Sequence, residues 1–359
     1  MSILGLHHIT LVSSDAQRTV DFYTRVLGLR LIKQTVNFDD PGAYHLYFGD
    51  QIGSPGTAIT FFEWKHVPQG RRGLGGTHHF ALRVADYENL LRWKRRLVDL
   101  GISVKGPYHR FYFQSIYFQD PDGVILEIAT EGPGWTMDEP AESLGTRALH
   151  PPAEMVLRNR DEQRIQAETW PDPVEEIVPA MTLQRGMHHI TAIGADINRS
   201  NDFYAGLLGM RLVKRTFNFD DPNSAHWYWG VGDSPPGTIL TYFERDPRTE
   251  PPARIGFGQT HHFALAVADE DSQLAWREKL LSAGCNVSPV MERVYFKSIY
   301  TRDPDGHIVE LATLGPGFLV DEDQAALGSG LRLPPWLEAQ RAQIQAGLTP
   351  LQIPETARV

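Results

Sequence analysis

The segment LHHITLVSSDAQRTVDFYTRVLGLRLIKQTVNFDDP, residues 6–41, returns 181 positions later as MHHITAIGADINRSNDFYAGLLGMRLVKRTFNFDDP, residues 187–222. Two further segments recur 183 positions later, THHFALRVAD (77–86) as THHFALAVAD (260–269) and FQSIYFQDPDGVILEIATEGPG (113–134) as FKSIYTRDPDGHIVELATLGPG (296–317). Chance does not produce so many identities in fixed register, and self-similarity of this kind indicates an internal duplication. The chain therefore contains two homologous halves.

Each half repeats a smaller pattern. A His-His pair opens a strand-like segment at His7 and again at His78, and a segment with apolar residues at helical spacing follows each one. Glycines at the expected stop positions, Gly28 and Gly101, end these predicted helices. Alternating patterns then predict strands at the segments 46–50, 57–64, 110–118 and 124–130. The sequence thus predicts an α+β protein built from four βαβββ modules in two tandem halves.

The pattern also predicts where the halves begin and end. We expect a first half of two modules at 1–135, and a second half of two modules at 184–320. The segment 136–183 is rich in proline and charged residues and is predicted to connect them, with a helix within 155–168. Residues 321–359 are expected to form a C-terminal tail.

Composition and charge exclude several classes of protein. The net charge is −10 and the pI is about 5.8, which argues against a nucleic-acid or membrane-surface partner. No apolar run is long enough for a transmembrane helix or a signal peptide, so we expect a cytoplasmic protein. The one cysteine, Cys285, cannot form an intrachain disulfide and is interpreted as a small buried residue.

Strand alternation assigns faces to the chemically important side chains. His262 shares its face with Ala264 and Ala266, whereas bulky residues occupy the other face, so His262 should project into a space that small side chains keep open. His8 shares a face with Thr10 by the same rule. Glu310 lies in the middle of an apolar strand, where a carboxylate is costly to bury unless it is paired or bound to a metal. Glu127 occupies the same position in the first half.

This combination of residues resembles the vicinal-oxygen-chelate superfamily, which includes glyoxalases, bleomycin-resistance proteins and extradiol dioxygenases. Within it, several motifs resemble the hydroquinone-cleaving branch of the ring-cleaving dioxygenases: LHHIT, NFDDP, YHLYFGD, GSPGT and the R-x6-Y-x9-E spacing that ends at Glu310. The resemblance implies cupped mixed sheets around a metal, with iron held by His8, His262 and Glu310. It also implies a set of residues that contact the metal ligands or face the substrate: His7, Thr10, His261, Arg293 and Tyr300.

A second complete set of the same residue types is present. The triad His79, His189 and Glu127 is flanked by the matching residues His78, His188, Thr191, Arg110 and Tyr117. The chain therefore has the residues for two metal sites. Each site could be assembled within one half or from both halves, and spacing does not separate these arrangements. The resemblance to the hydroquinone branch favours the crossed arrangement, which places His8 with Glu310 rather than with Glu127.

Several of these residues have a structural alternative. Strict alternation points the first histidine of each pair away from the ligand face, and only an irregularity in the strand would turn it toward the ligands. Tyr300 could pack in the core, and Arg293 could be a surface charge. NFDDP is interpreted as a turn rather than a ligand set.

The function that these expectations support is an Fe(II)-dependent extradiol-type dioxygenase, with Mn(II) as the alternative metal. Two imidazoles and one carboxylate leave adjacent metal positions for a substrate oxygen and O2, so the expected partners are a small aromatic diol, hydroquinone or catechol-like, and O2. By resemblance, His261 or Tyr300 would move protons and Arg293 would stabilise an anion. Assembly into a homo-oligomer is compatible with the sequence.

Two alternatives belong to other classes. A glyoxalase-like isomerase or thiol transferase would use Zn(II), Ni(II) or Mn(II), typically with a fourth protein ligand. A non-catalytic protein that sequesters small molecules would lack the triad.

Overall fold

The computed structural model describes residues 1–354, and its helices and strands follow the predicted βαβββ order four times. The first half forms two modules: β1 (Gly5–Ser13), α1 (Ala16–Asp21) with the π-helical segment η1 (Phe22–Val26), β2 (Arg30–Asn37), β3 (Asp40–Gly49) and β4 (Ala58–Glu63), then β5 (Thr77–Val84), α2 (Tyr87–Asp99), β6 (Lys105–His109), β7 (Gln114–Gln119) and β8 (Ile125–Thr130). The second half forms the other two: β9 (Met187–Gly194), α4 (Ile197–Asn201) with the π-helical segment η6 (Asp202–Leu207), β10 (Arg211–Phe217), β11 (Ala225–Gly230) and β12 (Ile239–Glu244), then β13 (Gln259–Val267), α5 (Glu270–Ser282), β14 (Met291–Glu292), β15 (Lys297–Arg302) and β16 (Ile308–Thr313).

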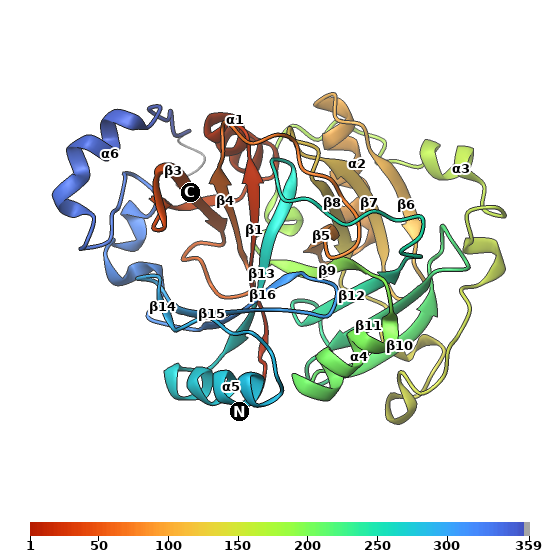
Figure 1. The fold of residues 1–359 in the computed structure, drawn as a ribbon. Coiled ribbons are helices and arrows are strands. Elements are labelled where there is room, and N and C mark those ends of the chain that lie inside the picture. The colour runs from red at the N-terminus through yellow and green to blue at the C-terminus, as the bar shows by residue number, and fades with distance from the viewer. Residues whose placement is uncertain (355–359) are drawn as a thin grey trace.

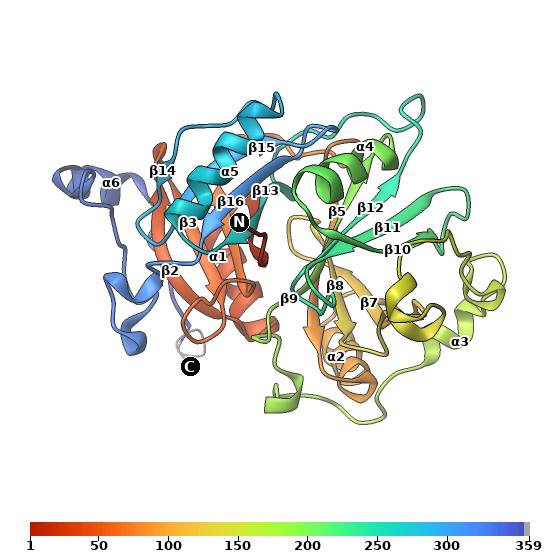
Figure 2. The ribbon, with the colours of Figure 1, turned by 90° about the horizontal axis from the view of Figure 1, so that it is seen from below.

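The modules combine into two eight-stranded sheets, and each sheet takes one module from each half. One sheet has the order β14-β15-β16-β13-β1-β4-β3-β2 and joins the fourth module to the first. The other has the order β10-β11-β12-β9-β5-β8-β7-β6 and joins the third module to the second. In Figures 1 and 2 the two ends of the colour scale lie together in one lobe, whereas the middle of the chain forms the other lobe. The α+β fold with mixed sheets is confirmed.

The two modules of each sheet meet along an antiparallel strand pair. β1 pairs with β13 in one sheet, and β5 pairs with β9 in the other. Parallel pairs lie on either side of the first junction, β1 with β4 and β13 with β16. Because β1 belongs to the first module and β13 to the fourth, their pairing brings the first and last modules of the chain together.

Two long helices cover the outer faces of the sheets. α2 and α5 each begin after an aspartate, Asp86 and Asp269, whose side chain accepts a hydrogen bond from a backbone amide of the first turn. Each helix buries a tryptophan completely, Trp93 and Trp276. The predicted stop of α2 is confirmed, because Gly101 adopts φ +78°, which favours glycine.

The connector between the halves and the C-terminal tail each pack against the half that they do not directly follow. The connector lies beside β10, where Leu149 N–H donates to Arg215 O at 2.9 Å, and the tail lies beside β2, where Arg332 N–H donates to Gln34 O at 2.8 Å. The helix expected within 155–168 is restricted to the six residues of α3 (Glu162–Ala167), and the tail contains α6 (Arg341–Gly347). Short 3-10 turns make up the other regular structure of these segments: η2 (Trp135–Met137), η3 (Ala141–Ser143), η4 (Ala153–Met155), η5 (Pro179–Met181), η7 (Phe318–Val320), η8 (Gln324–Ala326) and η9 (Glu338–Gln340). Residues 355–359 of the predicted tail lie outside the described residues.

The strand predicted at 110–118 is wrong at its beginning. Residues 110–113 form a tight turn in which Arg110 N–H donates to Phe113 O at 2.8 Å and Phe111 has φ +67°. β7 starts only at Gln114, because the chain must reverse here for β6 to pair with β7. The turn contains three consecutive aromatic residues, Phe111, Tyr112 and Phe113, and aromatic residues favour strands, which explains the error.

Within residues 1–354, no helix combines the length and the apolar composition that crossing a membrane requires.

The packed face of β13 allows a first prediction. Phe263 is 1% exposed and lies in the main hydrophobic core. Phe263→Ala is expected to lower the free energy of unfolding by about 3–5 kcal/mol, because it removes buried contacts and leaves a cavity. Denaturant unfolding measures the loss, and Phe80→Ala, at the matching buried position of β5, should give a loss of the same size. A loss below about 1 kcal/mol would contradict this packing.

A buried aspartate between the lobes allows a prediction of pH dependence. Asp120, in the turn between β7 and β8, accepts a hydrogen bond from Tyr23 of η1 at 3.2 Å, and burial raises the pKa of its carboxyl to about 7. An acid with a raised pKa favours the folded state at low pH, and this contribution is lost as the pH rises through the folded-state pKa. Each pKa unit is worth about 1.4 kcal/mol, so the rise from 3.8 to about 7 makes ionised Asp120 cost on the order of 4 kcal/mol at pH 8.

Asp120→Asn should therefore raise the thermal unfolding midpoint at pH 8 more than at pH 5. Asp303 is the matched control: burial alone would raise its pKa, but the buried imidazole of His307 outweighs burial and holds the pKa below its usual range. Asp303→Asn is expected to destabilise the protein near neutral pH. If the two asparagine variants shift the midpoint alike, the charge assignment for Asp120 is wrong.

Candidate metal centres

Three side chains converge on one point in the centre of the sheet that joins the fourth module to the first, which we call the first sheet. His8 of β1, His262 of β13 and Glu310 of β16 are buried, and each offers a donor atom within 4.8 Å of the others. The His8 Nε2 lies 3.3 Å from Glu310 Oε2, the His262 Nε2 lies 2.9 Å from the same oxygen, and the two imidazole nitrogens are 3.3 Å apart. Donors at about 2.0–2.2 Å from one metal, at right angles to each other, would be about 3 Å apart. The spacing therefore fits one face of a metal coordination sphere.

Strand register explains why these three residues meet. Ala264 of β13 is paired with His8 on one side and with Glu310 on the other, so the three residues form a row across adjacent strands. The methyl group of Ala264 leaves room above the row. His262 lies two residues along β13 on the same face. The expected open space next to the small residues of β13 is thus present.

The second sheet repeats the arrangement. His79 of β5 and His189 of β9 lie 2.7 Å and 3.3 Å from Glu127 Oε2 of β8, and their Nε2 atoms are 3.3 Å apart. Ala81 is again paired with both His189 and Glu127. Both triads draw ligands from both halves of the sequence, so the fold adopts the crossed arrangement.

The carboxylates show that these donor sets suit a cation. Glu310 Oε1 accepts a hydrogen bond from the Ser298 hydroxyl, whereas the buried Oε2 has no hydrogen-bond partner. Glu127 Oε2 has none either, and its other oxygen accepts from Ser115. A buried carboxylate oxygen without a donor is costly, and two imidazole nitrogens facing it supply lone pairs rather than protons. Each triad is a His/His/Glu metal site, which a divalent cation would complete.

The ionisation states fit the same interpretation. Burial alone would raise the pKa of Glu310, but His8 and His262 outweigh it and hold the pKa well below its usual range. Burial lowers the pKa of His262. A bound cation would take the place of the imidazole protons, because a metal binds the ionised carboxylate and the imidazole lone pairs.

Each ligand histidine is held by the histidine that precedes it. The His8 Nδ1 lies 2.9 Å from the His7 Nδ1, and the His7 Nε2 lies 3.1 Å from the Thr313 carbonyl oxygen. A carbonyl only accepts, so His7 carries its proton on Nε2 and accepts at Nδ1 from His8 Nδ1–H. This tautomer leaves the His8 Nε2 lone pair free for the metal. Burial lowers the pKa of His7 to about 3, so His7 remains neutral as this chain of hydrogen bonds requires.

The preceding histidines reach the ligands because each one occupies a β-bulge. Leu6 is paired with Leu265 and His8 with Ala264, which leaves His7 as an extra residue on its strand. The same shift of register leaves His261, His78 and His188 unpaired. In a regular strand the first histidine of each pair would point away from the ligands. A bulge turns the side chain of its extra residue, so this histidine points toward them instead. In all four pairs the two Nδ1 atoms are 2.7–2.9 Å apart.

A small chamber lies next to the first triad. Its volume is about 30 Å³, and eleven residues line it: His8, Asn37, Phe38, Asp39, His45, Tyr47, Phe62, His262, Arg293, Phe296 and Tyr300. Of the residues that the resemblance singled out, Arg293 and Tyr300 line this chamber together with two ligands. His7 and His261 do not line the chamber but contact the Nδ1 atoms of the ligands His8 and His262. The Thr10 hydroxyl is hydrogen-bonded to the Thr60 hydroxyl of the neighbouring strand at 2.8 Å.

Arg293 connects the chamber wall to its rim. Its Nε donates to the Tyr300 hydroxyl at 3.3 Å, and its terminal nitrogen pairs with Asp39 at 3.1 Å. Asp39 belongs to the NFDDP segment, which forms the β2–β3 turn, where the Asn37 side chain accepts from the Asp39 amide at 3.0 Å. NFDDP is therefore a turn, as interpreted, and it supplies a rim residue to the chamber.

Sequence reasoning missed a third histidine at each centre. His45 of β3 is hydrogen-bonded through Nε2 to the Thr60 hydroxyl at 2.9 Å and through Nδ1 to the Tyr47 hydroxyl at 3.0 Å. Thr60 in turn contacts Thr10, so a hydrogen-bonded row extends along the chamber wall. His226 repeats these bonds with Thr241 and Tyr228 in the other sheet. The repeat could have revealed both residues, because His45 and His226 occupy the same position of the two halves.

The second triad has the same immediate wall but a much larger space. All eleven residues that line the first chamber recur with the same identity, namely His189, Asn218, Phe219, Asp220, His226, Tyr228, Phe243, His79, Arg110, Phe113 and Tyr117, and all eleven line a cavity of about 1330 Å³. Arg110 again bonds to Tyr117, at 3.3 Å, and pairs with Asp220 at 3.2 Å. The two centres therefore have the same residues next to the metal position but differ in the volume of the space beyond these residues.

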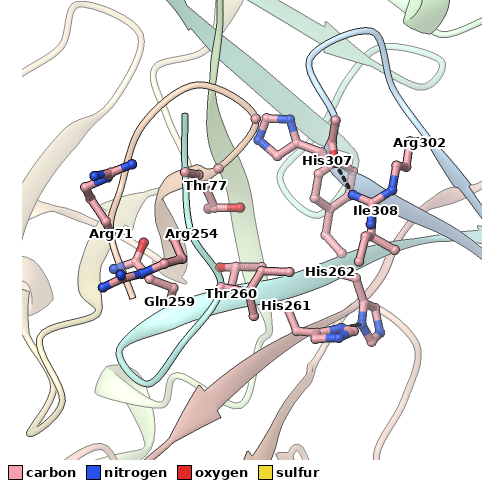
Figure 3. Close-up of a pocket in the computed structure, with 16 residues that line it drawn as sticks. Arg71, Thr77, Arg254, Gln259, Thr260, His261, His262, Arg302, His307 and Ile308 are labelled. Atoms are coloured by element: carbon pink, nitrogen blue, oxygen red, sulfur yellow. Dashed lines mark hydrogen bonds between the residues drawn. The ribbon is translucent and has the colours of Figure 1, made fainter. Parts of the chain in front are cut away.

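A separate pocket of about 30 Å³ lies where loops from both lobes meet near β13. Figure 3 shows the adjacent rings of His261 and His262 on one side of it, and Thr77, Arg71 and His307 around the rest. It offers space for about two water molecules and does not enlarge the first chamber.

Residues 5–128 and 186–311 match the family model described as the glyoxalase/bleomycin resistance protein/dioxygenase superfamily. The chain belongs to this superfamily. Among its members, "Putative ring-cleaving dioxygenase MhqA" of Bacillus subtilis is 33% identical over 98% of this chain and 100% of its own length. The chlorohydroquinone/hydroquinone 1,2-dioxygenase of Sphingobium indicum is 30% identical over 95% of this chain and 94% of its own. The crystal structure of a "putative dioxygenase" from Bacillus subtilis covers 99% of both chains with a TM-score of 0.79 and 31% identity.

The histidine pairs of this superfamily member allow a prediction about metal affinity. His7→Ala should weaken metal binding at the first centre by about 10- to 100-fold, because His8 loses the partner that fixes its tautomer. Competition with a chromophoric chelator measures the affinity of each centre. His188→Ala is the matched variant and should weaken only the second centre. Unchanged affinity in both variants would show that the bulged histidines do not support the ligands.

Proposed function

We propose that this protein is an Fe(II)-dependent ring-cleaving dioxygenase that opens a hydroquinone or catechol-like aromatic diol with O2. The observation that carries the proposal is the facial set of two imidazoles and one carboxylate beside the chamber that Arg293 and Tyr300 line. Three ligands on one face leave adjacent positions open, which is the arrangement of non-heme Fe(II) oxygenases. Neither triad includes a fourth His, Cys, Asp or Glu ligand within the described residues, which speaks against the isomerase alternative.

The metal is proposed to be Fe(II), with Mn(II) as the second candidate. Imidazole and carboxylate suit both ions, and no thiolate is present in either donor set. When bound, such an ion would acidify a coordinated phenol and bring the diol and O2 together at adjacent positions. His8, His262 and Glu310 would hold it at the first centre, and His79, His189 and Glu127 at the second.

Tyr300 is proposed to exchange a proton with the substrate. Burial raises the pKa of its hydroxyl, so the hydroxyl stays protonated at neutral pH. Arg293 Nε–H already donates to the Tyr300 oxygen, which leaves the tyrosine proton free to point toward a substrate oxygen in the chamber. The Tyr300 ring lies 5.6 Å from the ring of His262, so its hydroxyl belongs to the space next to the metal position. Such a group suits general acid–base catalysis.

Arg293 is proposed to stabilise negative charge on the substrate. Its side chain is 17% exposed, and it remains cationic because its neighbours include Asp39, Tyr300 and Glu310. A fixed guanidinium beside a partly closed chamber favours an anionic state of the ring oxygens over a neutral one. His7, Thr10 and His261 are proposed as positioning residues, since they contact ligands or the strand beside them.

Hydroquinones are preferred over catechols in this proposal. The Sphingobium relative whose name includes hydroquinone aligns with almost the whole chain, and the crossed triads agree with the resemblance seen in the motifs. Both centres are proposed to be active, because the eleven residues around each metal position are the same.

Oxygen consumption tests the proposal directly. Protein freed of metal, loaded with Fe(II) without oxygen and then mixed with aerated hydroquinone or catechol should consume O2 and yield ring-opened products that mass spectrometry identifies. Chelation should abolish the uptake, and added Fe(II) should restore it. Metal-dependent isomerisation or thiol transfer without oxygen uptake would overturn the proposal in favour of a glyoxalase-like activity.

A further inference from the structure

The two metal centres have the same residues in their inner walls but different volumes of space beyond these walls. Every side chain that lines the first chamber has an identical counterpart at the second triad. Any difference in what the centres accept must therefore come from residues beyond this wall. The first chamber measures about 30 Å³, whereas the cavity that contains the second measures about 1330 Å³.

The additional space at the second centre extends away from the metal between the first two modules. Its lining beyond the shared wall includes the apolar side chains of Phe22, Val26, Leu100, Ile102 and Val104. Such a surface favours an apolar ligand group over water. A cavity above 1000 Å³ exceeds what a single ring requires, since whole drug-sized ligands occupy about 300–1000 Å³.

The arginines of this cavity are already paired. Arg160 of the connector forms ion pairs with Asp220 and Glu162, and Arg245 pairs with Asp221 at 3.1 Å. Paired cations at the border do not favour an anionic substituent over a neutral one. The apolar extension therefore determines the kind of ligand that fits.

The C-terminal tail and the connector also differ in the size of the side chain that each places near a metal centre. After the Pro334-Pro335 pair, Trp336 of the tail packs edge-to-face on Phe38 of the first chamber, with ring centroids 5.7 Å apart. After the matching Pro151-Pro152 pair the connector has Ala153. The β2–β3 turn that borders the first chamber is thus braced by a large ring that the second centre lacks.

Resting on the proposed function, we propose that the two metal centres divide aromatic diols by size. The centre of His79, His189 and Glu127 accepts diols with a bulky apolar substituent, such as a second ring, in the extension between the first two modules. The centre of His8, His262 and Glu310 accepts single-ring diols, for which its chamber of about 30 Å³ must open.

Variants that keep one centre each provide the test. Glu310→Gln retains only the second centre and Glu127→Gln retains only the first, with metal content measured for both. Each variant is loaded with Fe(II) without oxygen, and calorimetry measures the Kd of hydroquinone and of phenylhydroquinone. The ratio of the phenylhydroquinone Kd to the hydroquinone Kd should be at least about tenfold higher for the first centre than for the second, a difference of about 1.4 kcal/mol.

A second pair of variants tests the extension in the chain with both triads. Ile102→Trp fills the extension, and Cys285→Trp makes the same change at the matching position of the other sheet. Only Ile102→Trp should weaken the tighter phase of phenylhydroquinone binding, by about tenfold or more. Thermal unfolding verifies that both variants are folded.

The outcomes separate this inference from the proposed function. Binding without oxygen does not depend on ring cleavage, so a size difference without oxygen uptake would support the division and overturn the dioxygenase. Equal Kd ratios at the two centres, together with oxygen uptake, would overturn the division alone. Failure of both diols to bind either centre would overturn both.

Discussion

Replacing Glu310 by glutamine is expected to leave the chain with one tightly bound metal ion instead of two. Glu310 is the only anion of its triad, and its Oε2 is the atom closest to both imidazole nitrogens. Loss of a supporting residue around a ligand typically costs about 10- to 100-fold in affinity, so loss of a ligand should cost more than about 100-fold. Metal analysis after gel filtration measures the stoichiometry.

The same variant should also lose the stabilisation that the metal confers on the first sheet. The ligands come from β1 and from β13 and β16, which lie at opposite ends of the chain, so a bound ion joins the first module to the fourth. A ligand at 100 times its Kd stabilises the folded state by about 2.7 kcal/mol. Added Fe(II) should therefore raise the unfolding midpoint of Glu310→Gln less than that of the original chain.

Glu127→Gln is the matched control for this prediction. It should also retain one metal ion, but at the first centre, and the double variant should retain none. Two ions in either single variant would show that the carboxylate is not a ligand. One ion in the original chain would show that only one of the triads binds metal under these conditions.

Tyr300→Phe is expected to retain iron and to slow turnover by about 100- to 10,000-fold, the usual range for loss of a general acid or base. The second centre would mask this effect, because Tyr117 stands at the matching position of an identical wall. The variant must therefore be made together with Glu127→Gln, so that only the first centre turns over. Oxygen-electrode rates with hydroquinone give kcat and KM.

The expected loss lies in kcat, because the tyrosine proton is needed in the reaction and not for the metal. The pH dependence should also change if Tyr300 transfers a proton, whereas a packing role would leave the profile unaltered. Tyr117→Phe together with Glu310→Gln is the matched variant of the other centre. An unchanged kcat in both pairs would return the two tyrosines to a role in core packing.

Local patterns were sufficient for the modules and for the types of ligand. The repeated His-His pairs, the helix stops and the alternation around Glu310 follow from strand and helix periodicity, which depends only on residues close in sequence. Local patterns do not give the beginning of β7, because the aromatic residues of the turn at 110–113 have the composition of a strand. His45 has no histidine beside it on its strand, so only its recurrence as His226 in the second half distinguishes it.

The fourfold βαβββ organisation and the two sets of His, His and Glu follow from the amino-acid sequence alone. The crossing of each set between the halves follows only from the folded structure, because β1 is able to pair with β13 or with β5 under the same alternation rule. The folded structure also decides that His7 reaches His8, since a β-bulge arises from the register between two distant strands. The unequal space at the two metal centres depends on how the connector and the tail pack against modules far away in sequence, and local patterns carry no information about such contacts.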